Sequence, residues 1–212
     1  STPANNSTCI PIRPTLTWVA VPGQQNYQLE IATDLEFANI LYTANPTSNS
    51  HQLPLSSVLD NFSQYYWRVC AVRGGNYGAW SEQFTFKTSS DKPELLSPLH
   101  QATSQNVELT LDWDDLTNVE QYLVQLSTNS NFSNVLILDD YVTESSIFVD
   151  ELNVNTYYYW RVAAVEEDCQ GPWSSVFRFK TTAVIGFNYT TNWNQHNFGD
   201  TEIGSTKQYP FN

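Results

Sequence analysis

The sequence of 212 residues is short of several features that would point to particular classes of protein. It contains no methionine, only three cysteines, and nine lysine or arginine residues against 22 acidic ones. The resulting net charge of −13 repels polyanions, so we expect no nucleic-acid partner. No apolar run is long enough to span a bilayer, and we expect no membrane insertion. The missing methionine, even at position 1, favours a mature or excised piece of a longer protein.

Signatures of catalysis are also lacking. The three histidines, at 51, 100 and 196, fall in separate predicted loops and share no metal-binding or catalytic spacing with other residues. There is no G-x-S-x-G nucleophile elbow, and the pair Gly74 and Gly75 lies in a predicted hairpin turn rather than in a phosphate-binding loop. We therefore expect no enzymatic activity and no required cofactor.

What the sequence does contain is an internal repeat. The residues YYWRV occur at 65–69 and again at 158–162, and the tails that follow end in FTFKT and FRFKT. In the same alignment LTW at 16–18 corresponds to LDW at 111–113. Each unit has about the size of one β-sandwich. The predicted organisation is an N-terminal segment 1–12, a first domain 13–89, a linker 90–93, a second domain 94–183, and a tail 184–212 that looks like the start of a further β domain.

Within each unit the pattern predicts strands. Apolar and polar residues alternate in NYQLEIAT (26–33) and in EQYLVQLST (120–128), and no stretch has sustained helical periodicity. Short strands separated by clusters of Asn, Gly, Pro, Ser and Asp indicate an antiparallel sandwich. The predicted fold class is all-β, with two β-sandwiches in tandem.

Four features recur in both units: a tryptophan on the second strand, a tyrosine on the third, the run L-x-x-x-[ST]-x-Y before the sixth strand, and a final WS-x-x-F-x-F-K-T. They comprise Trp18, Tyr27, Leu59, Ser63 and Tyr65 in the first unit and Trp113, Tyr122, Leu152, Thr156 and Tyr158 in the second. Each unit thereby resembles a fibronectin type III domain, an immunoglobulin-like sandwich. The YYWRV variant is similar to domains of secreted and surface-exposed bacterial proteins, often attached to enzymes or adhesins. The resemblance implies that Tyr65 and Tyr158 are tyrosine corners, whose hydroxyls bond to backbone before the strand.

Side chains of one parity in a strand face the core, so the repeated motif divides into two halves. Tyr65, Trp67 and Val69 are predicted to point inward, with their counterparts in the second unit. The outward residues are Tyr66, Arg68, Tyr159 and Arg161. We interpret them either as cross-strand packing or as an exposed binding face, and we expect Trp80 and Trp173 on the neighbouring strand to stack on the two arginines.

The acidic residues are concentrated in the second half, where residues 91–182 carry 15 acidic and four basic side chains. Two loops of the second domain are predicted to meet at the pole that faces the first domain. Their carboxylates are those of Asp114, Asp115, Glu166, Glu167 and Asp168. Such a cluster suits Ca²⁺, and the alternative is a solvated surface without a metal.

Three cysteines leave at least one unpaired. Cys9 and Cys70 are predicted to form a disulfide that pins the N-terminal segment to the sixth strand, with Cys70 on the outer face. Cys169, in the acidic loop, would then be free or paired outside this chain.

The function expected from these features is that of a non-catalytic extracellular module of a secreted or surface protein. It would space, present or dock neighbouring domains of the same chain, with a role in protein–protein contact or adhesion. The alternative is a carbohydrate-binding or receptor-like pair of domains. Either reading implies a protein or glycan ligand and a location outside the cell or on its surface.

Overall fold

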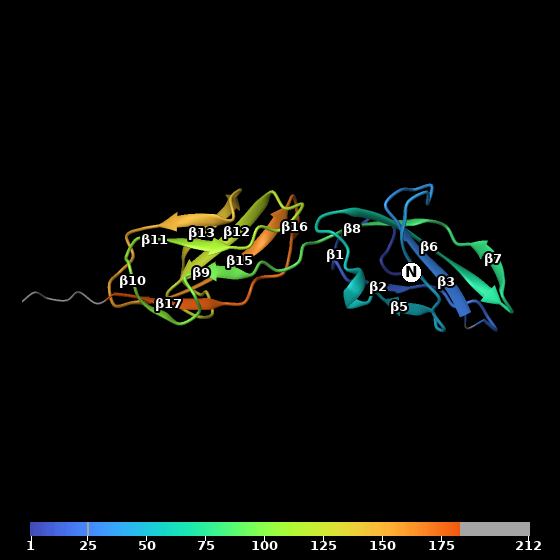
Figure 1. Ribbon diagram of the computed structural model, residues 1–212, viewed down its shortest axis with the longest axis horizontal. Helices are drawn as coiled ribbons and strands as arrows, with labels where there is room; N and C mark the ends of the chain where they lie inside the picture. Colours follow the sequence, from blue (N-terminus) through green and yellow to red (C-terminus); the bar gives the residue numbers. More distant parts are fainter. Residues whose placement is uncertain (25, 183–212) are drawn as a thin grey trace, which may run out of the picture.

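The computed structural model describes residues 1–24 and 26–182, which form two β-sandwiches lying end to end (Figure 1). The predicted all-β fold with two tandem sandwiches is confirmed. The expected tail at 184–212 lies outside the described residues. The one described helix is a short 3-10 turn, Leu55–Ser57, and the described chain contains no helix with the length and apolar character of a membrane span.

The first sandwich has a larger sheet in the order β1, β8, β6, β3, β4, with β7 pairing to β6, and a smaller sheet of β2 and β5. The larger sheet comprises β1 (Ser7–Ile10), β3 (Asn26–Ala32), β4 (Ile40–Ala44), β6 (Gln64–Arg73), β7 (Asn76–Trp80) and β8 (Phe84–Thr88). The smaller one comprises β2 (Thr15–Thr17) and β5 (Ser50–Gln52). Residues 7–10, which the sequence places in an N-terminal segment, form an edge strand parallel to β8.

The second sandwich repeats this arrangement. Its larger sheet has the order β10, β17, β15, β12, β13, with β16 pairing to β15. These strands are β10 (Ala102–Gln105), β12 (Gln121–Ser127), β13 (Val135–Val142), β15 (Tyr157–Glu166), β16 (Cys169–Gln170) and β17 (Phe177–Thr181). The smaller sheet has three strands: β9 (Leu95–Ser97), β11 (Leu109–Trp113) and β14 (Ser146–Val149).

The alternation of the YYWRV strands positions the two cores as expected. Trp67 and Trp160 are fully buried, and the inward tyrosines and valines lie beside them in two separate apolar clusters. The hydroxyl of Tyr65 accepts a hydrogen bond of 3.0 Å from the backbone N–H of Asp60, and that of Tyr158 accepts one of 2.7 Å from Asn153. Both tyrosine corners are thus confirmed, and each ties a loop to its own core.

The tyrosine corner predicts that loss of the Tyr65 hydroxyl destabilises the protein more than loss of the Tyr66 hydroxyl. Replacing Tyr65 with phenylalanine leaves the Asp60 N–H without its acceptor, and we expect it to lower the free energy of unfolding by about 1–3 kcal/mol. The matched control is Tyr66→Phe, since that outward hydroxyl only accepts from the exposed side chain of Gln64, and it should change stability by less than about 0.5 kcal/mol. Urea unfolding followed by tryptophan fluorescence measures both. Equal losses for the two variants would contradict the corner.

Candidate functional site at the junction of the sandwiches

The outward arginine of the first motif lies between two aromatic rings. The guanidinium carbon of Arg68 lies 4.1 Å from the centroid of the Phe37 ring and 4.2 Å from that of Trp80. Its Nη2 is also 2.7 Å from a carboxylate oxygen of Glu30, whose side chain is buried. The charge of Arg68 is therefore satisfied by a neighbour on β3 while both of its faces are covered.

Arg161 occupies the same setting in the second sandwich. Its guanidinium carbon lies 4.2 Å from the Phe132 ring and 4.1 Å from the Trp173 ring. Here the partner on the adjacent strand is neutral, since Arg161 Nε donates to Gln125 Oε1 at 2.9 Å. Burial lowers the pKa of Arg161 from its usual value. The two units thus share one geometry with an ion pair in one copy and an amide in the other.

The predicted stacking on Trp80 and Trp173 is confirmed, but the second ring of each stack was missed. Phe37 and Phe132 both have left-handed backbone, with φ of 57° and 56°, which is unusual for a bulky residue. A signal was present, because the two phenylalanines align in the repeat. The role of Tyr66, Arg68, Tyr159 and Arg161 in ligand binding stays a prediction; all four side chains are half-buried.

At the junction, a side chain of the first sandwich enters the core of the second. Phe62, in the loop before β6, is buried among the apolar residues of the second sandwich's cluster. Its φ is 45°, and Asn155 at the equivalent position of the second unit has a φ of 51°. Asparagine tolerates this left-handed conformation more readily than phenylalanine does. The aromatic ring is thus placed at a position where the backbone disfavours it, and it connects the two domains.

Polar contacts surround Phe62. The side-chain amide of Asn61 donates to the Thr117 carbonyl in the second sandwich at 3.0 Å, and its oxygen accepts from the Asp91 N–H of the linker at 2.7 Å. Gly171 leaves room for the linker, because a Cβ there would lie 1.9 Å from Ser90 Oγ. One asparagine therefore holds both the linker and the facing loop in place.

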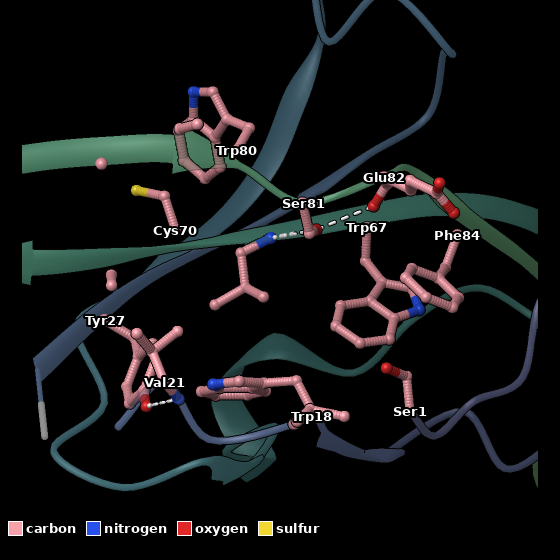
Figure 2. A pocket seen from close by; sticks show the side chains of 15 residues that line it. Ser1, Trp18, Val21, Tyr27, Trp67, Cys70, Trp80, Ser81, Glu82 and Phe84 are labelled. Carbon is pink, nitrogen blue, oxygen red and sulfur yellow. Dashed lines mark hydrogen bonds between the residues drawn. The ribbon is translucent and has the colours of Figure 1, made fainter. Parts of the chain in front are cut away.

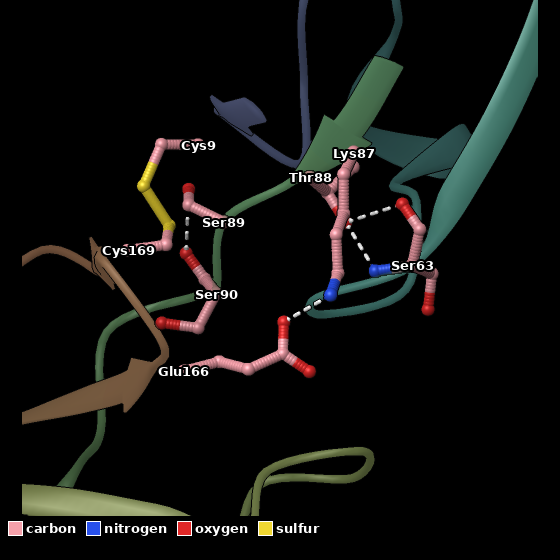
Figure 3. Close-up of a disulfide and its surroundings, with 8 residues drawn as sticks. All are labelled: Cys9, Ser63, Lys87, Thr88, Ser89, Ser90, Glu166 and Cys169. Atoms are coloured by element: carbon pink, nitrogen blue, oxygen red, sulfur yellow. Dashed lines mark hydrogen bonds and ion pairs between the residues drawn. A yellow bond between two sulfur atoms is a disulfide. The ribbon is translucent and has the colours of Figure 1, made fainter. Parts of the chain in front are cut away.

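A disulfide joins the two sandwiches, and it corrects the predicted pairing of Cys9 with Cys70. Cys9 on β1 is bonded to Cys169 on β16; Figure 3 shows this bond beside Ser89 and the linker residue Ser90. β1 runs parallel to β8, which carries Cys9 toward the second sandwich. Cys70 lies about 20 Å along β6 from the end of that strand nearest the junction, at the usual rise per residue. Cys70 is a free thiol, and it is buried rather than on an open outer face.

The structure also corrects the proposed calcium cluster of Asp114, Asp115, Glu166, Glu167 and Asp168. Among the residues that the structure describes, no group of three or more acidic, histidine or cysteine side chains is placed to hold a metal ion. Several of these carboxylates are engaged elsewhere. Glu166 pairs with Lys87 of the first sandwich at 2.5 Å (Figure 3), Asp114 accepts from the Glu94 N–H, and Asp115 accepts from the Tyr122 hydroxyl.

The hydroxyl of Tyr122 lies in an environment that opposes its ionisation. Burial raises its pKa to about 12, and the charge of Asp115 acts in the same direction. This tyrosine therefore stays protonated and donates to the carboxylate. Lys87 and the Tyr122 hydroxyl thus each engage one carboxylate, Glu166 in one acidic loop and Asp115 in the other.

The cysteine arrangement predicts a specific pattern of chemical modification. A digest of the native, unreduced protein should contain one cross-linked pair of peptides, carrying Cys9 and Cys169. Cys70 should resist iodoacetamide until the protein is unfolded, because it is buried and burial raises the pKa of its thiol. Mass spectrometry of both digests tests this. A peptide linking Cys9 to Cys70, or rapid alkylation of Cys70 in the native protein, would contradict the arrangement.

In the first sandwich, we expect the free energy of unfolding to depend on a hydrogen-bond acceptor at position 30 and only weakly on the negative charge there. Glu30→Ala leaves the guanidinium of Arg68 without its partner, and we expect a loss of about 3 kcal/mol in the free energy of unfolding. Glu30→Gln restores the arrangement that Gln125 has in the second sandwich and should cost only about 1 kcal/mol. Glu36→Ala, at an exposed position nearby in the sequence, is the control. Urea titration of the three variants distinguishes them, and equal losses for the two changes at Glu30 would refute the prediction.

Comparison with known proteins gives structural likenesses and no family assignment. No protein-family model matches the sequence, and no curated protein matches it. The chain is similar to the crystal structure of the chicken contactin-1 FN1–FN3 domains, with 17% identity and a TM-score of 0.36, over 84% of this chain and 63% of that one. It is also similar to the chicken interferon gamma receptor alpha chain, with 14% identity and a TM-score of 0.48, over 84% of this chain and 95% of that one. At such identities and TM-scores neither likeness assigns a family or a function to this chain, whose tandem pair of β-sandwiches is seen in its own strand order.

Proposed function

We propose that this chain is a non-catalytic extracellular module whose two sandwiches act as one stiff unit. Such a unit sets the distance and orientation between the parts of a larger protein that it connects, or presents one of them for docking. The setting indicated by the sequence resemblance is a secreted or surface-exposed bacterial protein. The function therefore lies in the geometry of the pair rather than in a reactive site.

The observation that carries the proposal is the junction. Inter-domain interfaces in one chain usually permit relative motion unless they are extensive and apolar. Here Phe62 is buried with the core residues of the next domain, Asn61 bonds across the joint, and Cys9 is covalently bound to Cys169. The half-exposed pair of Lys87 and Glu166 adds at most about 1 kcal/mol. The apolar and covalent contacts are thus the ones expected to stop hinge motion.

The same disulfide supports an extracellular location. Disulfides persist in oxidising compartments and are rare in the reducing cytosol. Closing a loop of this length stabilises a protein by about 5 kcal/mol in the chain-entropy model, and Cys9 and Cys169 are 160 positions apart. A module that owes part of its stiffness to this bond is stiffest where the bond stays oxidised.

The glycan-binding alternative receives less support from the described surface. A carbohydrate platform needs a contiguous patch of exposed aromatic rings. Trp80 and Trp173 are instead stacked on arginines, and the exposed aromatics Tyr77, Phe148 and Tyr157 lie on different strands of two domains. These residues offer separate rings rather than a platform.

Stiffness can be tested by measuring the orientation of the two domains in solution. Residual dipolar couplings of the oxidised protein should fit one alignment tensor for both sandwiches. In the double variant Cys9→Ser, Cys169→Ser we expect the alignment tensors fitted separately to the two sandwiches to differ only modestly, since Phe62 still joins the second core. Adding Phe62→Ala to that variant should give two independent tensors, while each sandwich keeps its dispersed spectrum.

Phe148→Ala is the matched control, because this phenylalanine is on β14 and 61% exposed. Added to the same cysteine variant, it should leave the alignment unchanged. Two independent tensors in the native oxidised protein would overturn the proposal, whatever the variants show.

A further inference from the structure

A hydrogen-bonded pair of titratable side chains lies between the two sheets of the first sandwich. The Tyr42 hydroxyl oxygen and His51 Nε2 are 2.8 Å apart, and the two rings are stacked with their centroids 5.8 Å apart. Tyr42 is on β4, the edge strand of the larger sheet, and His51 is on β5 of the smaller sheet. The pair therefore connects one sheet to the other.

Around this pair the core of the first sandwich is largely apolar. Leu16 lies directly opposite His51 across the smaller sheet, and because Leu16 is fully buried, His51 is on the face turned toward the core. Tyr42 packs against the same core cluster. Farther along the sandwich, Trp18 and Trp67 point into the space between the sheets (Figure 2). Two titratable rings are thus placed at the margin of an apolar core.

The second sandwich has isoleucines at both of these positions. By the strand pairings, Tyr42 aligns with Ile137 and His51 aligns with Ile147. Ile147 packs against the core cluster of the second sandwich. The polar pair is therefore not a requirement of the fold, and it distinguishes the first sandwich from the second.

Protonation of His51 places a positive charge at this margin. Burial lowers the pKa of His51 from its usual value, so the charged form is disfavoured in the closed sandwich. Burial raises the pKa of Tyr42, which stays neutral. A protonated imidazole can still donate to the Tyr42 oxygen, so it is the burial of a charge, rather than loss of the hydrogen bond, that opposes the closed arrangement. Mild acid is enough to protonate a histidine.

The charged groups of the neighbouring elements leave a protonated His51 uncompensated. Other than His51, neither β2 nor β4 nor residues 45–59 contain an acidic or basic residue. On β3, which pairs with β4, Glu30 is bound to Arg68 on the outer face of the sheet. Arg13, before β2, donates to a backbone carbonyl directly after β5 at 2.6 Å, and its positive charge opposes a second one nearby.

The two strands that this pair joins have few other hydrogen-bonded neighbours. β5 has three residues and belongs to the two-stranded sheet with β2, and β4 is an edge strand that pairs with β3. Two-stranded sheets are marginally stable on their own, and such peripheral elements open at a lower free energy than the core does. A modest change in the free energy of the contact between Tyr42 and His51 therefore shifts this edge between closed and open.

We propose that Tyr42 and His51 form an acid-sensitive latch in the first sandwich. At neutral pH the latch holds β4 against β5, and protonation of His51 releases this edge while the second sandwich stays closed. Because the pKa of His51 is lower in the folded protein than in the unfolded chain, the stabilisation is complete above the usual pKa of histidine and is lost as the pH falls below it. The latch lies within the first sandwich, so it does not depend on the stiffness of the junction.

Hydrogen exchange of the whole protein tests the latch. Protection factors of the backbone amides, corrected for the intrinsic pH dependence of exchange, are compared at about pH 7.5 and about pH 5.5, on either side of the usual pKa of histidine. We expect those of β4 and β5 to fall at least about threefold, because uptake of one proton on opening changes the equilibrium by up to about tenfold per pH unit. Those of β11 and β14, the equivalent strands of the second small sheet, should stay within experimental error.

Substitutions separate the titration of His51 from other effects of acid. His51→Gln keeps a side chain that can hydrogen-bond to Tyr42 but is uncharged at both pH values, so protection of β4 and β5 should not change with pH. The double variant Tyr42→Ile, His51→Ile copies the second sandwich and should behave in the same way. His100→Gln, at an exposed histidine of the second sandwich, is the matched control and should keep the response of the native protein.

Three results would overturn the latch. The first is unchanged protection of β4 and β5 in the native protein at the lower pH. The second is an equal loss in the native protein and in His51→Gln, which would place the responsible proton elsewhere. The third needs no variant: NMR titration of the His51 ring in the native protein should give a pKa below the usual value of histidine, and a pKa at or above that value removes the driving force.

Discussion

Trp67 and Trp160, each fully buried on the central strand of its sandwich, decide which side of that strand is inside. Burying one indole removes roughly 200 Å² from water, an upper estimate of about 5 kcal/mol, so the strand has one register. The tyrosine corner lies two residues before each tryptophan and the stacked arginine one residue after it. The buried core residue, the tyrosine that anchors the loop and the arginine on the outer face are therefore all placed by the alternation of side chains along one strand.

The positions at which the two repeats differ show how the two domains are joined and distinguished, whereas the positions at which they agree show what the fold requires. Phe62 stands where the second unit has Asn155, and Glu30 where it has Gln125. The first difference buries a ring in the neighbouring domain, and the second exchanges a neutral acceptor for a charged one. Residues that the fold requires recur in both units, whereas those that join or distinguish the domains occur once. The junction is built from the second kind.

Local pattern predicted the all-β fold and the Arg–Trp stacks, because each depends on residues of one strand or its neighbours, and the resemblance to fibronectin type III domains implied the two corners. The partner of Cys9 depends on how the two domains meet, and a repeat alignment carries no information about that. The acidic loops were expected to need an ion, yet Lys87 and the Tyr122 hydroxyl belong to elements whose proximity only the assembled structure gives. Phe37 and Phe132 were visible as aligned residues, but their left-handed backbone was not.

The position of the disulfide also sets the path of mechanical load through the pair. Tension applied at the two flanks enters by β1 at Cys9, crosses the sulfur–sulfur bond to Cys169, and leaves by β17. The chain between these cysteines, including both YYWRV strands, lies outside that covalent path. In the oxidised state only the residues before Cys9 and after Cys169 can extend under force, and reduction would add the residues between the two cysteines.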